Sequence, residues 1–595
     1  MTSTETCSYE FDPDRREQVR GRELRLVDDL PIGWSCDRPA GANGRCLFHR
    51  DPADKSDLEV LERLLEEIGR PPDSDAPDAV VENRFIGARF GDCRLAHRVL
   101  QPGNNRPIDL RFAHVEGDLI WDRAVVQNPV RLSGIVVDGE ATFRNARVNA
   151  DMDLSDSVIG GGLDASDAVF ENHFWCINTT FGGGVTFDRS VIEGDLCLAG
   201  AAIHGNLRLA STEIDGNACF SRIDCAGALV VEPRRIDGNV WCVRSSFETF
   251  DDPQEPDNLL RGGDMGGDVV IRESAFGDKI TLEGIDVDGR FIFEGTAVDS
   301  NWVDLTGCSI GSGTLGQPED ESAYTMYDFT DATVGDVRIR DVRGNGFERV
   351  YFKNTTFEGF DFGRHRSALL RTGWTIHTTE EAPSLAADAA AGTFEGVRSR
   401  IEGAADTARW TVDAVLDQVP SGVHRKSIHE TTYLKAKNGA NRIGDSKAAA
   451  EFFQKEMTFR RKRHAEVALN GWGRNTQTAT IVDRIAAAGA WVANVGLAAT
   501  TGYGEKPHRV LVVSLATILT FAGLFALVPG SEFGSEQSLS ELLLLSFQSF
   551  ITFVIGSPTG TDVPYALRFV SAVEGLIGAF LVALSVFALT RSVHR

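Results

Sequence analysis

Hydrophobic residues follow three different patterns along this chain. Between Phe85 and Phe362, short apolar segments alternate with polar turns, whereas from Arg366 to Thr500 the apolar spacing becomes helical. After Pro507 the apolar residues form long, nearly uninterrupted runs. Short alternation predicts strands, spacings of three and four predict helices, and long runs predict membrane spans. We therefore expect a β-rich region, a helical connector and a membrane-embedded end.

The β-rich region is built from repeats. Its clearest copies begin at Gly194, Gly205, Gly216, Gly227 and Gly238, so the glycine recurs about every 11 residues. Each copy combines a glycine beside Asp or Asn with a short alternating strand, which predicts a turn followed by a strand. Such a unit cannot bury its apolar face alone, but stacked copies can, and the repeats therefore predict a solenoid. Comparable units begin at Gly117, Gly139, Gly267, Gly277 and Gly289.

Two stretches carry a family resemblance, FENHFWCINTTFGGGVTFDRSVIEGD and VYFKNTTFEGFDF. They resemble divergent pentapeptide-repeat sequence, which implies a right-handed quadrilateral β-helix with about 20 residues per coil and roughly ten coils. Asp251 to Gly266 and Gly313 to Tyr324 interrupt the period, and we expect loops there. Cysteines at strand positions, such as Cys197, Cys219 and Cys242, are interpreted as core residues.

The head of the chain contains a candidate metal site. Cys7, Cys36, Cys46 and His49 supply three thiolates and an imidazole, a set that suits tetrahedral zinc in a structural role. The alternative is that the cysteines are small buried residues and that the histidine lies at the surface. The apolar spacing after this head predicts a helix from Ser56 to Ile68.

The connector is expected to be helical. Phe394 to Val419 places its apolar residues on one face, and Asp445 can cap a second helix, SKAAAEFFQKEMTFRRKRHAEV. The basic run from Arg460 to Arg463 suits either anionic lipid headgroups or a solvated helix face. YLKAKNGANRIGDSKAAAEFFQKEM resembles the helical segment that joins pentapeptide repeats to two-span pores in some prokaryotic channel-like proteins.

The C-terminal end contains two apolar runs long enough to cross a bilayer, Val510 to Val528 and Phe569 to Leu589. Between them, Leu542 to Gly556 is apolar but too short to cross, which predicts a re-entrant segment that enters the membrane and returns.

The order of span, SFQSFITFVIG and span resembles the pore module of two-span potassium channels, which implies a homotetramer that conducts monovalent cations. The filter signature of that family aligns best with Thr552, Phe553, Val554, Ile555 and Gly556. Val554 stands where the family has a glycine, and a β-branched residue does not suit positive φ, so potassium selectivity is not implied.

The second span contains Glu574, Gly575 and Gly578. An ionisable residue inside a span usually faces a cavity or a partner, so Glu574 is a functional candidate. The glycines suit either a bend of an inner helix or close helix packing. TTGYGE, which ends at Glu505, resembles the filter signature more closely, but it precedes the first strong span and is interpreted as a turn.

Charge and composition limit the classes of protein to which this chain can belong. The 595-residue chain has a net charge of −26 and a pI of about 4.9, which favours a solubility adaptation, for example to high salt, and excludes a basic nucleic-acid footprint. Positive residues flank both spans on one side, which predicts a multi-pass protein of the cell membrane with both termini in the cytoplasm. The N-terminus shows no signal peptide, and the cysteine spacing suits reduced thiols.

No enzyme signature is present. GSGTLG at Gly311 fits a nucleotide-binding pattern, but no helix pattern follows it and we expect a loop there. The predicted domains are a head (1–83), a β-helix (84–366), a helical connector (367–504) and a two-span domain (505–595).

The leading hypothesis is a cation channel with a cytoplasmic β-helix as a sensor or partner-binding arm. The first alternative is a non-conducting, membrane-anchored β-helix scaffold for protein interactions. A second alternative, imitation of the acidic outline of DNA by a soluble rod, conflicts with the spans.

Overall fold

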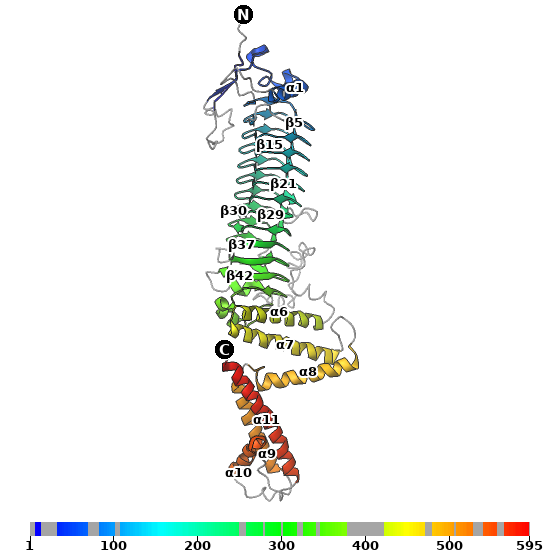
Figure 1. Cartoon of the computed structure of the whole chain (residues 1–595), viewed down its shortest axis with the longest axis vertical. Helices are drawn as coiled ribbons and strands as arrows, with labels where there is room; N and C mark the ends of the chain where they lie inside the picture. Colours follow the sequence, from blue (N-terminus) through cyan, green and yellow to red (C-terminus); the bar gives the residue numbers. More distant parts are fainter. Residues whose placement is uncertain are drawn as a thin grey trace, which may run out of the picture. The chain divides into compact units, whose positions relative to one another are not determined.

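The chain divides into two compact units, Met1–Phe360 and Asp361–Arg595. The predicted division into four domains stays a prediction. The computed structural model, drawn in Figure 1, describes residues 6–12, 33–69, 83–100, 107–248, 258–277, 280–298, 302–317, 325–340, 346–377, 422–470, 479–504, 507–527, 539–555 and 565–593.

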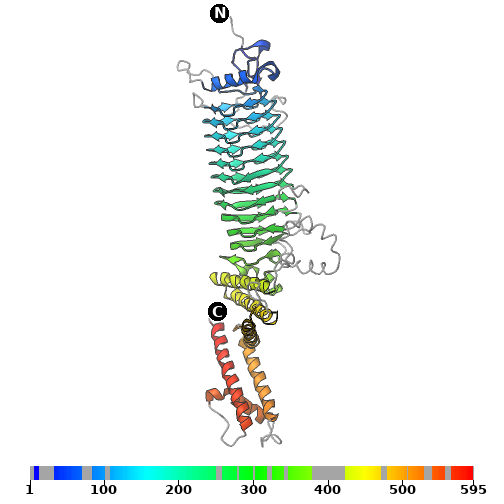
Figure 2. The same cartoon turned by 90° about the vertical axis from the view of Figure 1, so that its right-hand side faces the viewer.

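The first unit is mostly a β-solenoid of about 11 turns, so the predicted stacked architecture is confirmed. Its strands lie in layers along the axis of the unit (Figure 2). Up to β33 every fourth strand pairs in parallel, as in the series β3–β7–β11 and β4–β8–β12, so each of these coils contributes four short strands. Beyond β33, fewer and longer strands form each coil, as in the series β37–β40–β42. One coil contains β15 (Val158–Ile159), β16 (Leu163–Asp164), β17 (Val169–Phe170) and β18 (Phe174–Trp175).

Successive coils stack in a regular register. Val136 pairs with Val158 and Val158 pairs with Thr180, and side chains on adjacent coils that hydrogen-bond are typically 22 residues apart, as are Asp156 and Asn178. The strand side chains alternate inward and outward, as expected for a sheet buried on one face. Inward aromatic rings such as Phe174, Phe170 and Phe187 contact one another edge to face, with ring centroids 4.6 and 5.2 Å from that of Phe174.

The repeated glycines are required by the stacking of the coils. A Cβ on Gly216 would lie 2.5 Å from the carbonyl carbon of Gly194, and one on Gly238 would lie 2.4 Å from the carbonyl oxygen of Gly216. None of these three glycines has a positive φ. Their conformational freedom is therefore not needed, and the absence of a side chain is what lets neighbouring coils approach.

The predicted loops are wrong in the parts that the structure describes. Within Asp251 to Gly266, β32 (Asn258–Leu260) and β33 (Asp264–Met265) continue the coil. The Leu229 N–H donates to the Asn258 side chain 29 residues onward, not 22, because extra residues are inserted between these coils. Residues 251–257 lie outside the described residues.

The second correction concerns Gly313 to Tyr324 and the GSGTLG motif at Gly311. β40 (Ser309–Gly316) includes the whole motif and the first four residues of the predicted loop. It pairs with β37 (Asp286–Glu294) and β42 (Thr333–Arg340). The motif is therefore strand, because three longer strands pair there in parallel. Residues 318–324 lie outside the described residues.

The third correction concerns the cysteines. Cys242 is buried as predicted, but Cys197 and Cys219 are only half-buried. They follow the inward-facing Leu196 and Ala218 in β22 (Leu196–Cys197) and β26 (Ala218–Cys219), so they occupy the outward position of each strand.

The second unit is helical in its described parts. α6 (Gly422–Arg442) packs against α7 (Ser446–Asn470), and α7 packs against α8 (Ile481–Thr500). The Asp445 carboxylate accepts the Ala448 N–H at 2.9 Å, which confirms the predicted cap of α7. The helix expected from Phe394 to Val419 lies outside the described residues.

Three apolar helices complete this unit, α9 (Pro507–Leu527), α10 (Leu539–Ile555) and α11 (Tyr565–Val593). By length and composition, α8, α9 and most of α11 can each cross a membrane, and α10 is a shorter apolar helix. The unit therefore has the means for membrane association that the sequence predicted.

Candidate functional site

The candidate metal centre lies in the N-terminal head. β1 (Glu10–Phe11) pairs antiparallel with β2 (Trp34–Ser35), and this pairing brings together the segments that contain Cys7 and Cys36. The Cys7 N–H donates to the Arg38 carbonyl at 2.8 Å, and the Cys36 N–H donates to the Tyr9 carbonyl at 3.0 Å. The backbone thus fixes two of the four predicted ligands.

The structure brings all four predicted ligands into one buried cluster. Every ligand atom of Cys7, Cys36, Cys46 and His49 lies within 4.8 Å of the others. The Sγ atoms of Cys36 and Cys46 are 3.8 Å apart, and His49 Nδ1 lies 3.1 Å from Cys46 Sγ and 3.5 Å from Cys7 Sγ. The alternative of a surface histidine is wrong, since His49 is only 1% exposed.

Two of these spacings match a tetrahedral metal site. Zn–S bonds of about 2.3 Å and a Zn–N bond of about 2.05 Å place two sulfurs about 3.8 Å apart and a sulfur and a nitrogen about 3.6 Å apart. The Cys36–Cys46 and Cys7–His49 distances of 3.8 and 3.5 Å match these values. The Cys46–His49 distance of 3.1 Å is shorter than the tetrahedral value, so these two ligand atoms would move apart around a metal ion. With that adjustment the cluster could hold a metal ion.

The orientation of His49 is set by its second ring nitrogen. Nε2 lies 3.0 Å from the Ile86 carbonyl oxygen, which can only accept, so Nε2 carries the hydrogen. The lone pair of the neutral ring then lies on Nδ1, the atom that faces the sulfurs. A metal-binding histidine commonly donates its other N–H to a backbone carbonyl in this way. The Tyr9 ring stacks on the imidazole at 4.0 Å and 7° and holds its plane.

The thiols lie in an environment that favours thiolate at two positions. Hydrogen bonding from Cys36 lowers the pKa of the Cys46 thiol despite its burial, and the same contact with burial raises the pKa of Cys36 to about 12. Burial raises the pKa of Cys7, but the contact with the His49 ring and the hydrogen bond that the Cys46 N–H donates at 3.2 Å leave this pKa below its usual value.

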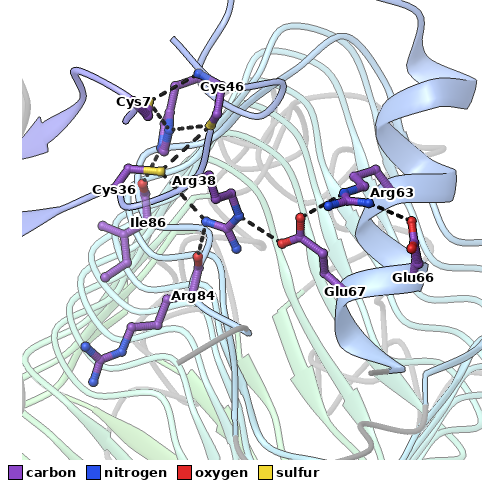
Figure 3. A network of polar contacts seen from close by, with 10 residues as sticks. Cys7, Cys36, Arg38, Cys46, Arg63, Glu66, Glu67, Arg84 and Ile86 are labelled. Carbon is purple, nitrogen blue, oxygen red and sulfur yellow. Dashed lines mark hydrogen bonds and ion pairs between the residues drawn. The ribbon is translucent and has the colours of Figure 1, made fainter. Parts of the chain in front are cut away.

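Side chains of the head also contact the first coil of the solenoid. Arg38 donates to the Arg84 carbonyl at 2.9 Å and forms an ion pair with Glu67 of α1 (Asp57–Ile68) at 2.8 Å, as Figure 3 shows. The Lys55 ammonium donates to the Arg89 carbonyl at 2.5 Å. No periodic pattern pointed to Arg38 or Lys55, because each contacts a residue distant in the chain.

The second candidate site is the polar interior of the apolar helices. Glu574 of α11 is fully buried, and the Ser546 hydroxyl of α10 donates to its carboxylate. Its Oε2 has no hydrogen-bond partner among the described residues. Ser549 and Ser571 form a second buried pair with their hydroxyl oxygens 2.9 Å apart. Polar positions within the apolar helices α10 and α11 were the signal that could have identified these serines.

The glycines of α11 lie at a helix contact. Gly575 and Gly578 are both buried, and a Cβ on Gly578 would lie 2.0 Å from the Phe550 carbonyl oxygen of α10. Close packing, one of the two predicted roles of these glycines, therefore holds at Gly578.

The candidate filter lies at the end of α10. Thr552, Phe553, Val554 and Ile555 belong to its last turn, and Gly556 lies outside the described residues. The closer match to the filter signature, TTGYGE, does not lie inside a membrane-spanning helix. It follows α8 and precedes α9. Thr501 to Gly504 form the predicted turn, in which Gly502, Tyr503 and Gly504 all have positive φ.

The basic run of α7 is partly neutralised within its own unit. Arg460 and Arg463 each form an ion pair with Glu430 at 2.8 Å, and Arg460 also pairs with Glu456 at 2.7 Å. Two of the four cations considered for lipid headgroups are therefore already paired with carboxylates.

Compared with known proteins, the chain matches no family model, no curated protein and no solved structure. Function must be inferred from the residues of this chain.

Proposed function

We propose that this protein is a membrane-anchored β-solenoid whose apolar helices assemble as a homotetrameric pore for monovalent cations. α9 and α11 are the two spans, and α10 is a re-entrant helix. The solenoid lies in the cytoplasm as a sensor or as an arm that binds a protein partner.

One observation carries this proposal: α10 contacts the middle of both long helices. The Ser546 hydroxyl lies 2.8 Å from the carbonyl of Ile518, halfway along α9, and Phe550 packs at Gly578, halfway along α11. A helix that touches the midpoints of two spans lies in the same hydrocarbon layer. At 17 residues, or about 25 Å, α10 is shorter than the bilayer core, which favours entry and return on one side.

α8 is long enough to span, but its neighbour argues against a third span. It packs along α7, which contains Lys447, Glu451, Lys455 and the Arg460 to Arg463 run. Carrying so many charged groups into hydrocarbon is too costly. The exposed residues Ile481, Val482, Ile485 and Val492 instead suit an in-plane position at the membrane surface.

The charges around the helices favour cations over anions. Glu574 is a buried acidic residue of α11 that faces Ser546 of α10. In the sequence, the segment between α9 and α11 also contains Glu532, Glu536 and Asp562. The C-terminal end of a helix carries partial negative charge, so the end of α10 also attracts a cation.

The second candidate is a non-conducting anchored scaffold. Val554, a β-branched residue at the filter position where the resembling channels have glycine, favours it. In that case the solenoid surface carries the function and the helices only hold it at the membrane.

Planar-bilayer recording of the purified protein separates the two candidates. We expect cation currents from a tetramer, measured together with the subunit number of the detergent-solubilised protein. Gly578→Ala forces α10 away from α11 and is expected to cost about 1–3 kcal/mol of packing and to reduce the current strongly.

Gly523→Ala is the matched control, because a Cβ on Gly523 of α9 meets no atom within 4 Å. It should leave the current unchanged. Tetramers without current, or a monomer or dimer in detergent, would favour the scaffold and overturn the pore.

A further inference from the structure

We propose that Cys7, Cys36, Cys46 and His49 bind one structural Zn²⁺ ion. This ion stabilises the contact between the N-terminal head and the first coil of the solenoid, whose outer edge has no further coil to pair with among the described residues. This inference is independent of the proposed pore, because it concerns a different unit and does not depend on conduction.

The ligand chemistry selects zinc. Three thiolates with one imidazole form a closed tetrahedral set that leaves no position for substrate, as in structural zinc sites. All four side chains are buried, and soft thiolate ligands exclude magnesium and calcium, which prefer oxygen. The Cys36–Cys46 separation of 3.8 Å equals a tetrahedral edge and is far longer than a disulfide bond of about 2.05 Å.

The solenoid has an edge that needs a cap. In the second coil, the Asp109 and Arg111 carbonyls accept the N–H groups of Phe85 and Gly87 from the first coil at 2.6 and 2.9 Å. Arg84 pairs with Asp109 in parallel, so the Arg84 and Ile86 carbonyls are the matching acceptors one coil earlier. Among the described residues no coil precedes them, and unpaired edge carbonyls are costly when buried.

Side chains of the head occupy these acceptors. Arg38 donates to the Arg84 carbonyl at 2.9 Å, and His49 Nε2 donates to the Ile86 carbonyl at 3.0 Å. His49 therefore serves both sites at once: one ring nitrogen pairs with the edge of the solenoid, and the other faces the three sulfurs. A metal on Nδ1 fixes the ring and strengthens the Nε2–H as a donor to the edge.

The metal also joins chain segments that are far apart in the sequence. Cys7 and His49 are 42 positions apart, and β1 and β2 contain only two residues each. A ligand set that spans them adds to the stabilisation that buried Phe11 and Phe48 and the Arg38–Glu67 ion pair supply, as in small metal-stabilised domains.

Metal analysis of the full-length purified protein tests the assignment. We expect about one zinc ion per chain. Cys46→Ser and His49→Ala should lose the zinc, whereas Cys93→Ser, which removes a buried cysteine of β4 (Cys93–Arg94) outside the cluster, should retain it. Replacement of zinc by Co²⁺ should give the visible absorption of a tetrahedral thiolate site.

A second measurement uses the wild-type chain and is independent of whether a variant folds. After zinc removal by a chelator, hydrogen exchange should rise in residues 33–69 and in the first coil (83–100), and stay unchanged in the central coils (152–248). Zinc would restore the protection. Absence of zinc, equal zinc in Cys46→Ser and wild type, a disulfide within the cluster, or unchanged exchange after chelation would each overturn the proposal.

Discussion

Two buried aspartates lie next to each other on successive coils of the solenoid, and burial makes one of the two carboxyl groups sensitive to pH. Asp304 of β39 (Trp302–Asp304) and Asp328 of β41 (Met326–Asp328) are paired in register, and both are buried. Each carboxylate accepts a nearby backbone N–H, from Thr306 at 3.0 Å and from Thr330 at 2.8 Å. Burial, with a contribution from Asp304, raises the pKa of Asp328 from 3.8 to about 7.

A folded-state pKa above the unfolded value means that the folded chain binds the proton more tightly. The stabilisation from Asp328 is then complete below about pH 4 and is lost as the pH rises toward 7. We expect the free energy of unfolding of the solenoid to fall by about 2 kcal/mol more between pH 5 and 7.5 in the wild type than in Asp328→Asn. Urea unfolding of both proteins at the two pH values measures this difference. Equal pH dependence in the two proteins would contradict the assignment.

At the scale of the element, the stacking of the coils depends on glycines, which have no side chain, as well as on buried apolar side chains. Gly194, Gly216 and Gly238 form a column on successive coils, with each missing Cβ directed at the backbone of the preceding coil. Gly311 of β40 is different, because a Cβ there meets nothing within 4 Å and its φ is not positive.

This contrast gives a matched pair of substitutions. Gly216→Ala should force two coils apart and lower the free energy of unfolding by about 1–3 kcal/mol. Gly311→Ala should change it by less than about 0.5 kcal/mol, since the added methyl group meets no neighbour. Denaturant titration of both variants measures the difference. If both were equally stable, coil stacking would not be the reason for the glycine repeat.

At the scale of the whole molecule, exposed apolar side chains gather in one part of the chain. Before residue 480, the described large apolar residues that are exposed are Leu58, Val99, Leu370, Ile443 and Leu469. After it, every described helix exposes several, among them Ile481, Leu511, Leu544, Phe569 and Phe580. Exposed apolar residues concentrated in this way indicate the part of the chain that is suited to contact a membrane.

We therefore expect the full-length protein to remain in the membrane fraction after alkaline washing, and a chain ending at Asn470 to be released into the soluble fraction. Fractionation followed by immunoblotting measures both. A truncated chain that still resists the wash would place the membrane contact before α8, and a full-length chain that is washed off would exclude insertion of α9 and α11.

The sequence by itself determined the features that depend on local pattern and length. Alternation with a repeated glycine predicted the solenoid, the length of the apolar runs predicted α9 and α11, and ligand type predicted the Cys7, Cys36, Cys46 and His49 cluster. The solenoid and helix predictions succeeded because strand alternation and the length of an apolar run are properties of neighbouring residues. The cluster was predicted from ligand type alone, and the fold brings its distant residues together.

Only the tertiary structure decided what depends on contacts between distant segments. It placed Cys197 and Cys219 on the outer face of their strands, and it showed that Gly216 is needed for the approach of another coil. It also placed the second nitrogen of His49 on the Ile86 carbonyl. Each outcome depends on which backbone segment lies next to the residue in the folded chain. That segment is at least about one coil away in the sequence, so no local pattern can identify it.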